Sequence, residues 1–344
     1  MLNVGLMGAA SITPRSVITP SKRMDDVRIC AIASKSKERA KEFAARYGIS
    51  HAYPDYESLL RSTNVDAVYI ALSNELHATW AIEAAKARKH ILIEKPMCLT
   101  SEEASRVIAA AEDNRVVILE AVAVQHHPWQ ASIREMVGRK PYGRLLGTMS
   151  TITFRLKEGQ GHRFSPEKGG GVFWDEGCYW CQFLQIVGDL GAEQVGGYST
   201  FSGPNGIDLT FKAFAEVDGV KSTFICSYEM PFDNTHVLVF ENGKARIRNF
   251  FAPMFGEYRL KIDIAPEDGD RQETIVFEPR NYFYEQLRFF ADVVQGRVEN
   301  IPVSASLDRI RFMEVIYGQA KTLHRLHPPN HYQAHQAHRS LFPG

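Results

Sequence analysis

The regular alternation of short apolar segments with amphipathic stretches is the feature that most restricts the fold of this chain. Five apolar segments rich in Val, Ile and Leu occur in the first 120 residues: LNVGLM (2–7), VRICAIAS (27–34), VDAVYIAL (65–72), HILIEK (90–95) and RVVILE (115–120). Stretches with helical periodicity lie between them, most clearly at 36–48, 74–89 and 100–114. Strands that are apolar on both faces and alternate with helices predict a parallel sheet covered on both sides.

After about residue 140 the pattern changes to alternating apolar and polar residues. The segments concerned are 143–156, 194–201, 208–217, 220–230, 236–249 and 258–267, with turn signals such as Asp218-Gly219 and Asn242-Gly243 between them. Such segments predict antiparallel strands with one face open to solvent or to a partner. Two more helices are predicted at 281–296 and 304–323.

We therefore predict an α/β fold with two domains. A nucleotide-type domain occupies residues 1–122, and an α/β domain with a large open, mainly antiparallel sheet occupies residues 123–330. We expect the last helix of the second domain to pack back on the first domain. Residues 331–344 form a Pro- and His-rich tail.

Bulk composition excludes several classes of protein. The chain has 344 residues, which suits about two domains, with 40 basic and 40 acidic side chains. A net charge of zero gives no attraction to nucleic acid or to an anionic membrane. The sequence contains no apolar run of membrane-spanning length and no cationic start before an apolar run, so we expect a cytoplasmic protein.

The cysteines and the tail histidines do not predict a disulfide framework or a metal site. The five cysteines are an odd number in mostly apolar surroundings: Cys30, Cys98, Cys178, Cys181 and Cys226. Cys178 and Cys181 form a C-x-x-C pair without a second pair, so both a redox and a zinc role are rejected. Three histidines fall at helical spacing, His331, His335 and His338, and a disordered end is favoured over metal binding there.

The first βα turn carries a partial dinucleotide fingerprint. Gly5 and Gly8 follow or end the first strand with a spacing one residue wider than the strict G-x-G, and Ala9, Ala10 and Ser11 supply small side chains. Glycines in this pattern tighten the turn and let the backbone approach a pyrophosphate. At the start of the first βαβ unit, cofactor binding is favoured over a plain turn.

The end of the second strand favours NADP(H) over NAD(H). An NAD-preferring site carries an acid there, but this chain has Ser34 and Lys35, with Arg39 next. Hydroxyl groups and cations suit a 2′-phosphate. The alternatives are a lysine-rich helix start on the surface and the use of NAD(H).

Two later motifs place polar side chains where chemistry can occur. Glu94-Lys95-Pro96 ends a predicted interior strand, at the sheet edge where ligands of open α/β folds bind, and the proline is a candidate for a cis bond. In GGGVFWDEGCYW (169–180), a helix opened by Asp175 would place Tyr179 one turn later on the same face. This pair is either a proton-transfer site or a helix cap beside a buried aromatic.

With these motifs in place, the chain resembles the glucose–fructose oxidoreductase/inositol dehydrogenase family. The resemblance rests on GLMGAASI (5–12, which adds Ile12 to the turn), SNELH (73–77), EKPM (94–97) and GGGVFWDEGCYW, in the family's order. It is greatest with the branch that has tyrosine at the last motif position, such as dihydrodiol and D-xylose dehydrogenases. The resemblance implies a Rossmann domain, an open-sheet domain and a nicotinamide in the cleft between them.

The resemblance and the chemistry of hydride transfer together assign roles to three side chains. Tyr179 is interpreted as the proton donor or acceptor for the substrate oxygen. Lys95 would orient the substrate and lower the pKa of Tyr179, because an ammonium stabilises a phenolate. Asp175 would hold the substrate or Lys95, with capping of the helix as an equal alternative. The three glycines would let the chain pass close to the nicotinamide and substrate.

Further residues are candidates with packing as the alternative. By resemblance, Ser73, Asn74, His77 and Glu94 border the nicotinamide, although relatives often have proline in place of Ser73. Gln125 replaces an arginine common in the family. The candidates for the substrate side of the cleft are Gln125, His126, His127, Pro128, His162 and Arg163.

These observations predict an oxidoreductase that acts on a sugar, cyclitol or cyclic diol. The alternatives are a dinucleotide-binding sensor without catalysis and a redox-assisted glycoside-cleaving enzyme. The open sheet is expected to form a homodimer or homotetramer.

Overall fold

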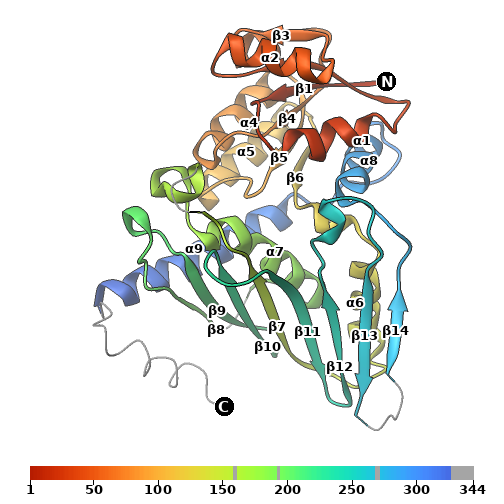
Figure 1. Cartoon of the computed structure of the whole chain (residues 1–344), viewed down its shortest axis with the longest axis vertical. Helices are drawn as coiled ribbons and strands as arrows, with labels where there is room; N and C mark the ends of the chain where they lie inside the picture. The colour runs from red at the N-terminus through yellow and green to blue at the C-terminus, as the bar shows by residue number, and fades with distance from the viewer. Residues whose placement is uncertain (158–160, 192–193, 268–271, 327–344) are drawn as a thin grey trace.

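The computed structural model describes residues 1–157, 161–191, 194–267 and 272–326, and the predicted tail with its three histidines lies outside them. Within this range the chain forms two sheets, one above the other in Figure 1. No helix of the described residues is long and apolar enough to cross a membrane.

The first sheet is parallel throughout and has the strand order β3-β2-β1-β4-β5-β6. Its strands are β1 (Leu2–Met7), β2 (Val27–Ala33), β3 (His51–Tyr53), β4 (Ala67–Ile70), β5 (His90–Glu94) and β6 (Ile118–Ala121). The order reverses between β1 and β4, and open α/β sheets bind ligands at such a switch point.

Helices cover both faces of this sheet. One face is covered mainly by α3 (Tyr56–Leu60), α4 (His77–Lys86), α5 (Ser101–Asp113) and the N-terminal part of α9 (Ser304–Leu326). The other face is covered by η1 (Pro14–Ile18), α1 (Thr19–Ser21), α2 (Lys37–Tyr47) and α8 (Tyr282–Val294). Both α8 and α9 therefore return from the end of the chain to complete the first domain.

The second sheet has eight strands in the order β14-β13-β12-β11-β7-β10-β9-β8. The strands are β7 (Leu145–Thr153), β8 (Gln194–Tyr198), β9 (Thr210–Val217), β10 (Val220–Ser227), β11 (Asp233–Phe240), β12 (Gly243–Arg248), β13 (Lys261–Pro266) and β14 (Glu273–Val276). The helices α6 (Trp129–Arg139), α7 (Val172–Val187) and α9 lie on one face, and the other face, toward the viewer in Figure 1, is open.

The α/β fold class is confirmed, and the differences from the sequence prediction are local. The short strands β3 and β14 and the helices α1, α3 and α6 were not predicted. One pair in the second sheet, β7 with β10, is parallel, because β7 enters the sheet between two strands that come later in the chain.

Candidate active site

The glycine-rich motif leads into α7, which begins at Val172. The prediction that Asp175 opens this helix is wrong. The N-terminal amide of Phe173 donates instead to Asp208 Oδ2 at 2.7 Å, and the Val172 amide donates to the Asp208 carbonyl. Asp208 precedes β9 and is far away in sequence, so the capping residue could not be found from local spacing.

Gly171 has a structural reason for its lack of a side chain. Its φ is +110°, and a Cβ atom there would lie 2.1 Å from Asp208 Oδ1. The glycine therefore lets the capping carboxylate approach the helix, whereas the sequence interpretation assigned the close approach to the cofactor and substrate.

Asp175 lies in the first turn of α7 and joins three polar side chains from other elements. Its Oδ1 accepts from Lys95 Nζ at 2.8 Å, and its Oδ2 accepts from Arg163 Nε at 2.5 Å and from the Tyr228 hydroxyl at 2.9 Å. Lys95 follows β5 directly, Arg163 lies on η4 (His162–Phe164) and Tyr228 follows β10. The structure thus brings together Lys95, Asp175 and Arg163 as candidate site residues and adds Tyr228.

The charges in this cluster stabilise one another. Burial alone would raise the pKa of Asp175, but Arg163 and Lys95 hold that pKa well below its usual range. Burial alone would lower the pKa of Lys95, but the Asp175 carboxylate, together with Tyr179 and Glu176, outweighs burial and raises that pKa. Asp175 also raises the pKa of Arg163. Asp175 is therefore an anion, and both partners are cations, at neutral pH.

Tyr179 lies one turn after Asp175 on the same helix and beside the same lysine. Lys95 Nζ lies 5.1 Å from the centre of the Tyr179 ring, whose edge packs against Phe251. Burial raises the pKa of Tyr179 well above its usual value, and the Lys95 ammonium opposes that rise without overcoming it. The net lowering of the Tyr179 pKa expected from the sequence is therefore wrong, although the effect of Lys95 has the expected direction.

Glu176 is a second buried carboxyl group in the cluster, and sequence reasoning missed it. Its side chain is buried, and within the described residues Oε2 has no hydrogen-bond partner. Burial and the neighbouring Asp175 carboxylate raise the pKa of Glu176 to about 8. An acidic residue in the middle of an apolar helix was the available signal.

The first βα turn contains a position where only glycine fits. Gly8 has a φ of +104°, and a Cβ atom there would lie 2.5 Å from the Ala71 carbonyl oxygen. The buried hydroxyl of Thr13, just before η1, has no partner among the described residues. Gly5 lies inside β1, where a side chain would crowd Leu59, so the fingerprint glycine of the turn is Gly8.

The remaining residues of the turn and of the β2 end surround this position. Ala9 is buried, Ala10 is half-buried, Ser11 is exposed and Ile12 is half-buried. Ser34 is buried, Lys35 is exposed, and Arg39 donates from Nη2 to the Ala9 carbonyl at 2.9 Å. This contact places the Arg39 guanidinium beside the first βα turn, so the residues present fit a phosphorylated dinucleotide.

Hydrogen bonds of the SNELH and EKPM motifs connect the loops that follow β4 and β5. His77 is fully buried and bonds the carbonyls of Pro96 and Leu72, and Asn74 donates to the Gly169 carbonyl. Ser73 bonds Glu75, and the Lys95–Pro96 peptide bond is cis. Glu94 accepts a hydrogen bond from Tyr69.

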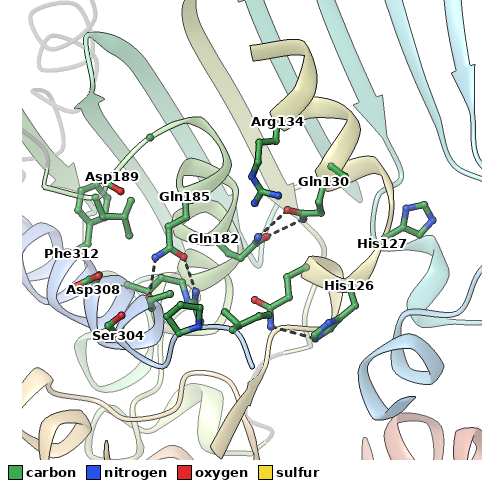
Figure 2. Close-up of a pocket in the computed structure, with 18 of the residues that line it drawn as sticks. His126, His127, Gln130, Arg134, Gln182, Gln185, Asp189, Ser304, Asp308 and Phe312 are labelled. Atoms are coloured by element: carbon green, nitrogen blue, oxygen red, sulfur yellow. Dashed lines mark hydrogen bonds between the residues drawn. The ribbon is translucent and has the colours of Figure 1, made fainter. Parts of the chain in front are cut away.

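The structure places Gln125 and His126 at a different cavity. This cavity has a volume of about 1430 Å³ and lies among α6, the end of α7, α8 and the start of α9 (Figure 2). His127 and Pro128 also line it, whereas Lys95, Asp175, Tyr179 and Arg163 do not. His126 packs against Phe289 with ring centres 4.8 Å apart. The sequence alone could not show which cavity the side chains of residues 125–128 line.

The cysteines are buried free thiols. Burial raises the pKa of both Cys178 and Cys181, because it disfavours the thiolate. Among the described residues no group of three or more His, Cys, Asp or Glu side chains could hold a metal ion.

With this geometry in view, comparison with known proteins identifies the family. Residues 2–122 match the oxidoreductase family with an NAD-binding Rossmann fold, and residues 131–246 match the GFO/IDH/MocA C-terminal domain. The chain therefore belongs to the GFO/IDH/MocA family of oxidoreductases.

Individual relatives align over most of the chain. It is similar to D-xylose 1-dehydrogenase (NADP(+)) 2 of Haloferax volcanii, at 29% identity over 92% of this chain and 97% of the relative. It is also similar to scyllo-inositol 2-dehydrogenase (NADP(+)) of Bacillus subtilis, at 26% identity over 87% and 90%. The crystal structure of a 3-ketoreductase from Actinomadura kijaniata with NADP and TDP-benzene has the same fold, with a TM-score of 0.83 and 24% identity over 92% of this chain and 97% of that one.

Proposed function

We propose that this protein is an NADP(H)-dependent dehydrogenase or reductase that acts on the CH–OH or carbonyl carbon of a sugar, cyclitol or cyclic diol. The observation that carries the proposal is the buried Lys95–Asp175 pair beside Tyr179, at the carboxyl edge of the parallel sheet. The names of the relatives, which include NADP(+)-dependent dehydrogenases of xylose and of inositol, support the cofactor and the class of substrate.

The cofactor would be held by the first βα turn around Gly8 and by Ser34, Lys35 and Arg39 at the end of β2. When bound, the nicotinamide supplies or accepts hydride. Tyr179 gives a proton to the substrate oxygen during reduction and takes it back during oxidation. Lys95, kept cationic by Asp175, orients the substrate hydroxyl and favours the phenolate form of Tyr179.

The test is turnover, followed by nicotinamide absorbance with NADP⁺ or NAD⁺ and a panel of aldoses, cyclitols and cyclic diols, and in the reverse direction with ketosugars. We expect turnover with NADP⁺ on at least one compound. Tyr179→Phe should lower kcat by roughly 100- to 10,000-fold, the range typical of a lost general acid or base. Tyr198→Phe, a change in the edge strand β8, is the matched control and should leave kcat unchanged.

Equal rates for Tyr179→Phe and the parent protein would contradict the role of this tyrosine. NADPH binding without turnover in either direction would favour the sensor alternative. Release of a free aglycone from a glycoside, without net consumption of cofactor, would favour glycoside cleavage.

A further inference from the structure

The turn that carries Lys95 is held from a second side by a buried carboxylate. Glu120 lies in β6, next to β5, and its Oε1 accepts from the Met97 amide at 3.0 Å. Its Oε2 pairs with Arg309 Nη2 of α9 at 2.5 Å. The side chains of Arg309 and Glu120 are 3% and 2% exposed. The carboxylate that accepts from the Met97 amide, two residues after Lys95, is thus held in place by a cation of α9.

Arg309 also reaches the helix that carries Asp175 and Tyr179. Its Nη1 donates to Gln185 Oε1 on α7 at 2.6 Å, and Gln185 in turn donates to the Ala305 carbonyl at 2.9 Å. Figure 2 shows Gln185 with both of these bonds. The contacts form a continuous chain from the Met97 amide through Glu120 and Arg309 to α7.

Among the ion pairs of the described residues, only Lys95–Asp175 and Arg309–Glu120 have both side chains no more than 11% exposed. Both join the edge of the first sheet to helices that follow residue 170. The energy of desolvating two charges makes a buried ion pair a poor source of stability, and well-packed apolar residues often replace it at no cost. The geometry that the pair imposes is then the better explanation for its presence.

We propose that Glu120 and Arg309 are positioning residues that fix the Lys95 turn against α7 for the reaction proposed above. Lys95 contacts Asp175 and lies over Tyr179, so a shift of the 95–97 turn changes both contacts at once. A misplacement of about 1 Å at a reacting group costs on the order of 100-fold in rate. The inference rests on the proposed function, but the position of the turn can be measured without turnover.

The test removes both charges together, in the double variant Glu120→Leu with Arg309→Met, so that neither charge is left buried without a partner. We expect a Tm close to that of the parent and unchanged NADPH affinity in a fluorescence titration. The kcat should fall by about tenfold or more. Hydrogen exchange of the segment 95–98 should become faster, because the Met97 amide loses its acceptor. Arg309→Lys keeps a cation for Glu120 but lacks the second nitrogen that bonds Gln185. Its kcat should lie between those of the double variant and the parent protein.

The matched control is Asp26→Asn with Arg288→Met. This ion pair, at 2.6 and 3.0 Å, also joins the first domain to a late helix, α8, but makes no contact with the Lys95 turn. We expect unchanged kcat and unchanged exchange at 95–98 in this control.

The proposal is overturned if the double variant keeps both the parent kcat and the parent exchange at 95–98. It is also overturned if kcat falls equally in the control. If the double variant does not fold, Arg309→Lys decides alone, because it lacks the bond to Gln185 on α7, and a parent kcat in that variant overturns the proposal. Absence of turnover in the parent contradicts the proposed function, whereas the exchange comparison still tests the position of the turn.

Discussion

Glu176 is a buried carboxyl group whose surroundings move its pKa into the physiological pH range. Its folded pKa of about 8 lies above the model-compound value of 4.5. A carboxyl group whose pKa is higher in the folded than in the unfolded protein binds its proton more tightly in the folded state, so protonation stabilises the fold. Its contribution therefore becomes progressively destabilising as pH rises from about 4.5 to about 8 and is constant above that range.

Glu176→Gln removes this dependence, because glutamine has the same shape and no titrating proton. We expect the difference in Tm between Glu176→Gln and the parent protein to become larger, in favour of the variant, from pH 5 to pH 8. Thermal unfolding measured across this range checks the prediction, with Glu112→Gln, an exposed residue of α5, as the control. A gain that is the same at both pH values would contradict the prediction.

Gly8 has a constrained backbone conformation and lies in the proposed cofactor site. Gly8→Ala combines a φ of +104° with a Cβ atom 2.5 Å from a backbone oxygen, so the turn itself must move. We expect a clear loss of Tm and weaker NADPH binding in a fluorescence titration. Gly48→Ala is the matched control, because Gly48 also has a positive φ, +72°, but has no atom within 4 Å of the added Cβ. That control should cost only about 1–2 kcal/mol of folding free energy and leave binding unchanged.

At the scale of elements, α7 is unusual because nearly all of its residues are buried. A helix end buried in this way needs partners for its free amides. Asp208, from the segment before β9, supplies two, its carboxylate for Phe173 and its carbonyl for Val172, and the carboxylate also accepts from the Tyr317 hydroxyl of α9 at 2.8 Å. One carboxyl group thus connects the start of α7 with the segment before β9 and with α9.

Asp208→Ala should therefore lower the free energy of unfolding by about 1–2 kcal/mol, the upper part of the range for a lost cap. Asp208→Asn, which retains an oxygen acceptor, should cost less. Asp55→Ala is the comparison, because Asp55 caps α3 at an exposed position where water can replace it. Denaturant unfolding of the three variants measures the differences, and an equal loss for Asp208→Ala and Asp208→Asn would contradict the capping role.

At the scale of the whole molecule, one face of the second sheet is not covered by any helix of the described residues. Paired residues of the central strands place partly exposed apolar groups on this face, including Met149 opposite Val237 and Ile225 opposite Thr151. Arg246 and Arg248 of β12 lie on the same face and are exposed. An apolar centre beside charged strands is typical of a protein interface.

We expect the parent protein to be a dimer or tetramer through this face, with light scattering as the measurement. Met149→Lys with Val237→Lys places two like charges opposite each other and should reduce the mass to that of a monomer of 38.8 kDa. Val315→Lys, at an exposed position of α9 on the helix-covered side of the sheet, should leave the mass unchanged. A monomeric parent would contradict the prediction.

The sequence by itself determined the features that depend on local pattern. Apolar runs in β1, β2, β4, β5 and β6 predicted the parallel sheet, because strands buried on both faces need apolar residues throughout. Motif spacing also indicated the Gly8 turn, the Lys95 strand end and the relation of Asp175 to Tyr179 along one helix. The short strands β3 and β14 were missed because three or four residues do not show a period.

Only the tertiary structure decided which distant residues meet. Segments many residues apart in the sequence make the contacts of the site, and no spacing rule relates them. These contacts are Asp208 with the first turn of α7, Tyr228 and Arg163 with Asp175, and Arg309 with Glu120. The raised pKa of Tyr179 has the same origin, because burial by surrounding elements outweighs the neighbouring ammonium. Local sequence fixes which backbone conformation each segment adopts, whereas the charges and contacts at the site depend on how the whole chain packs.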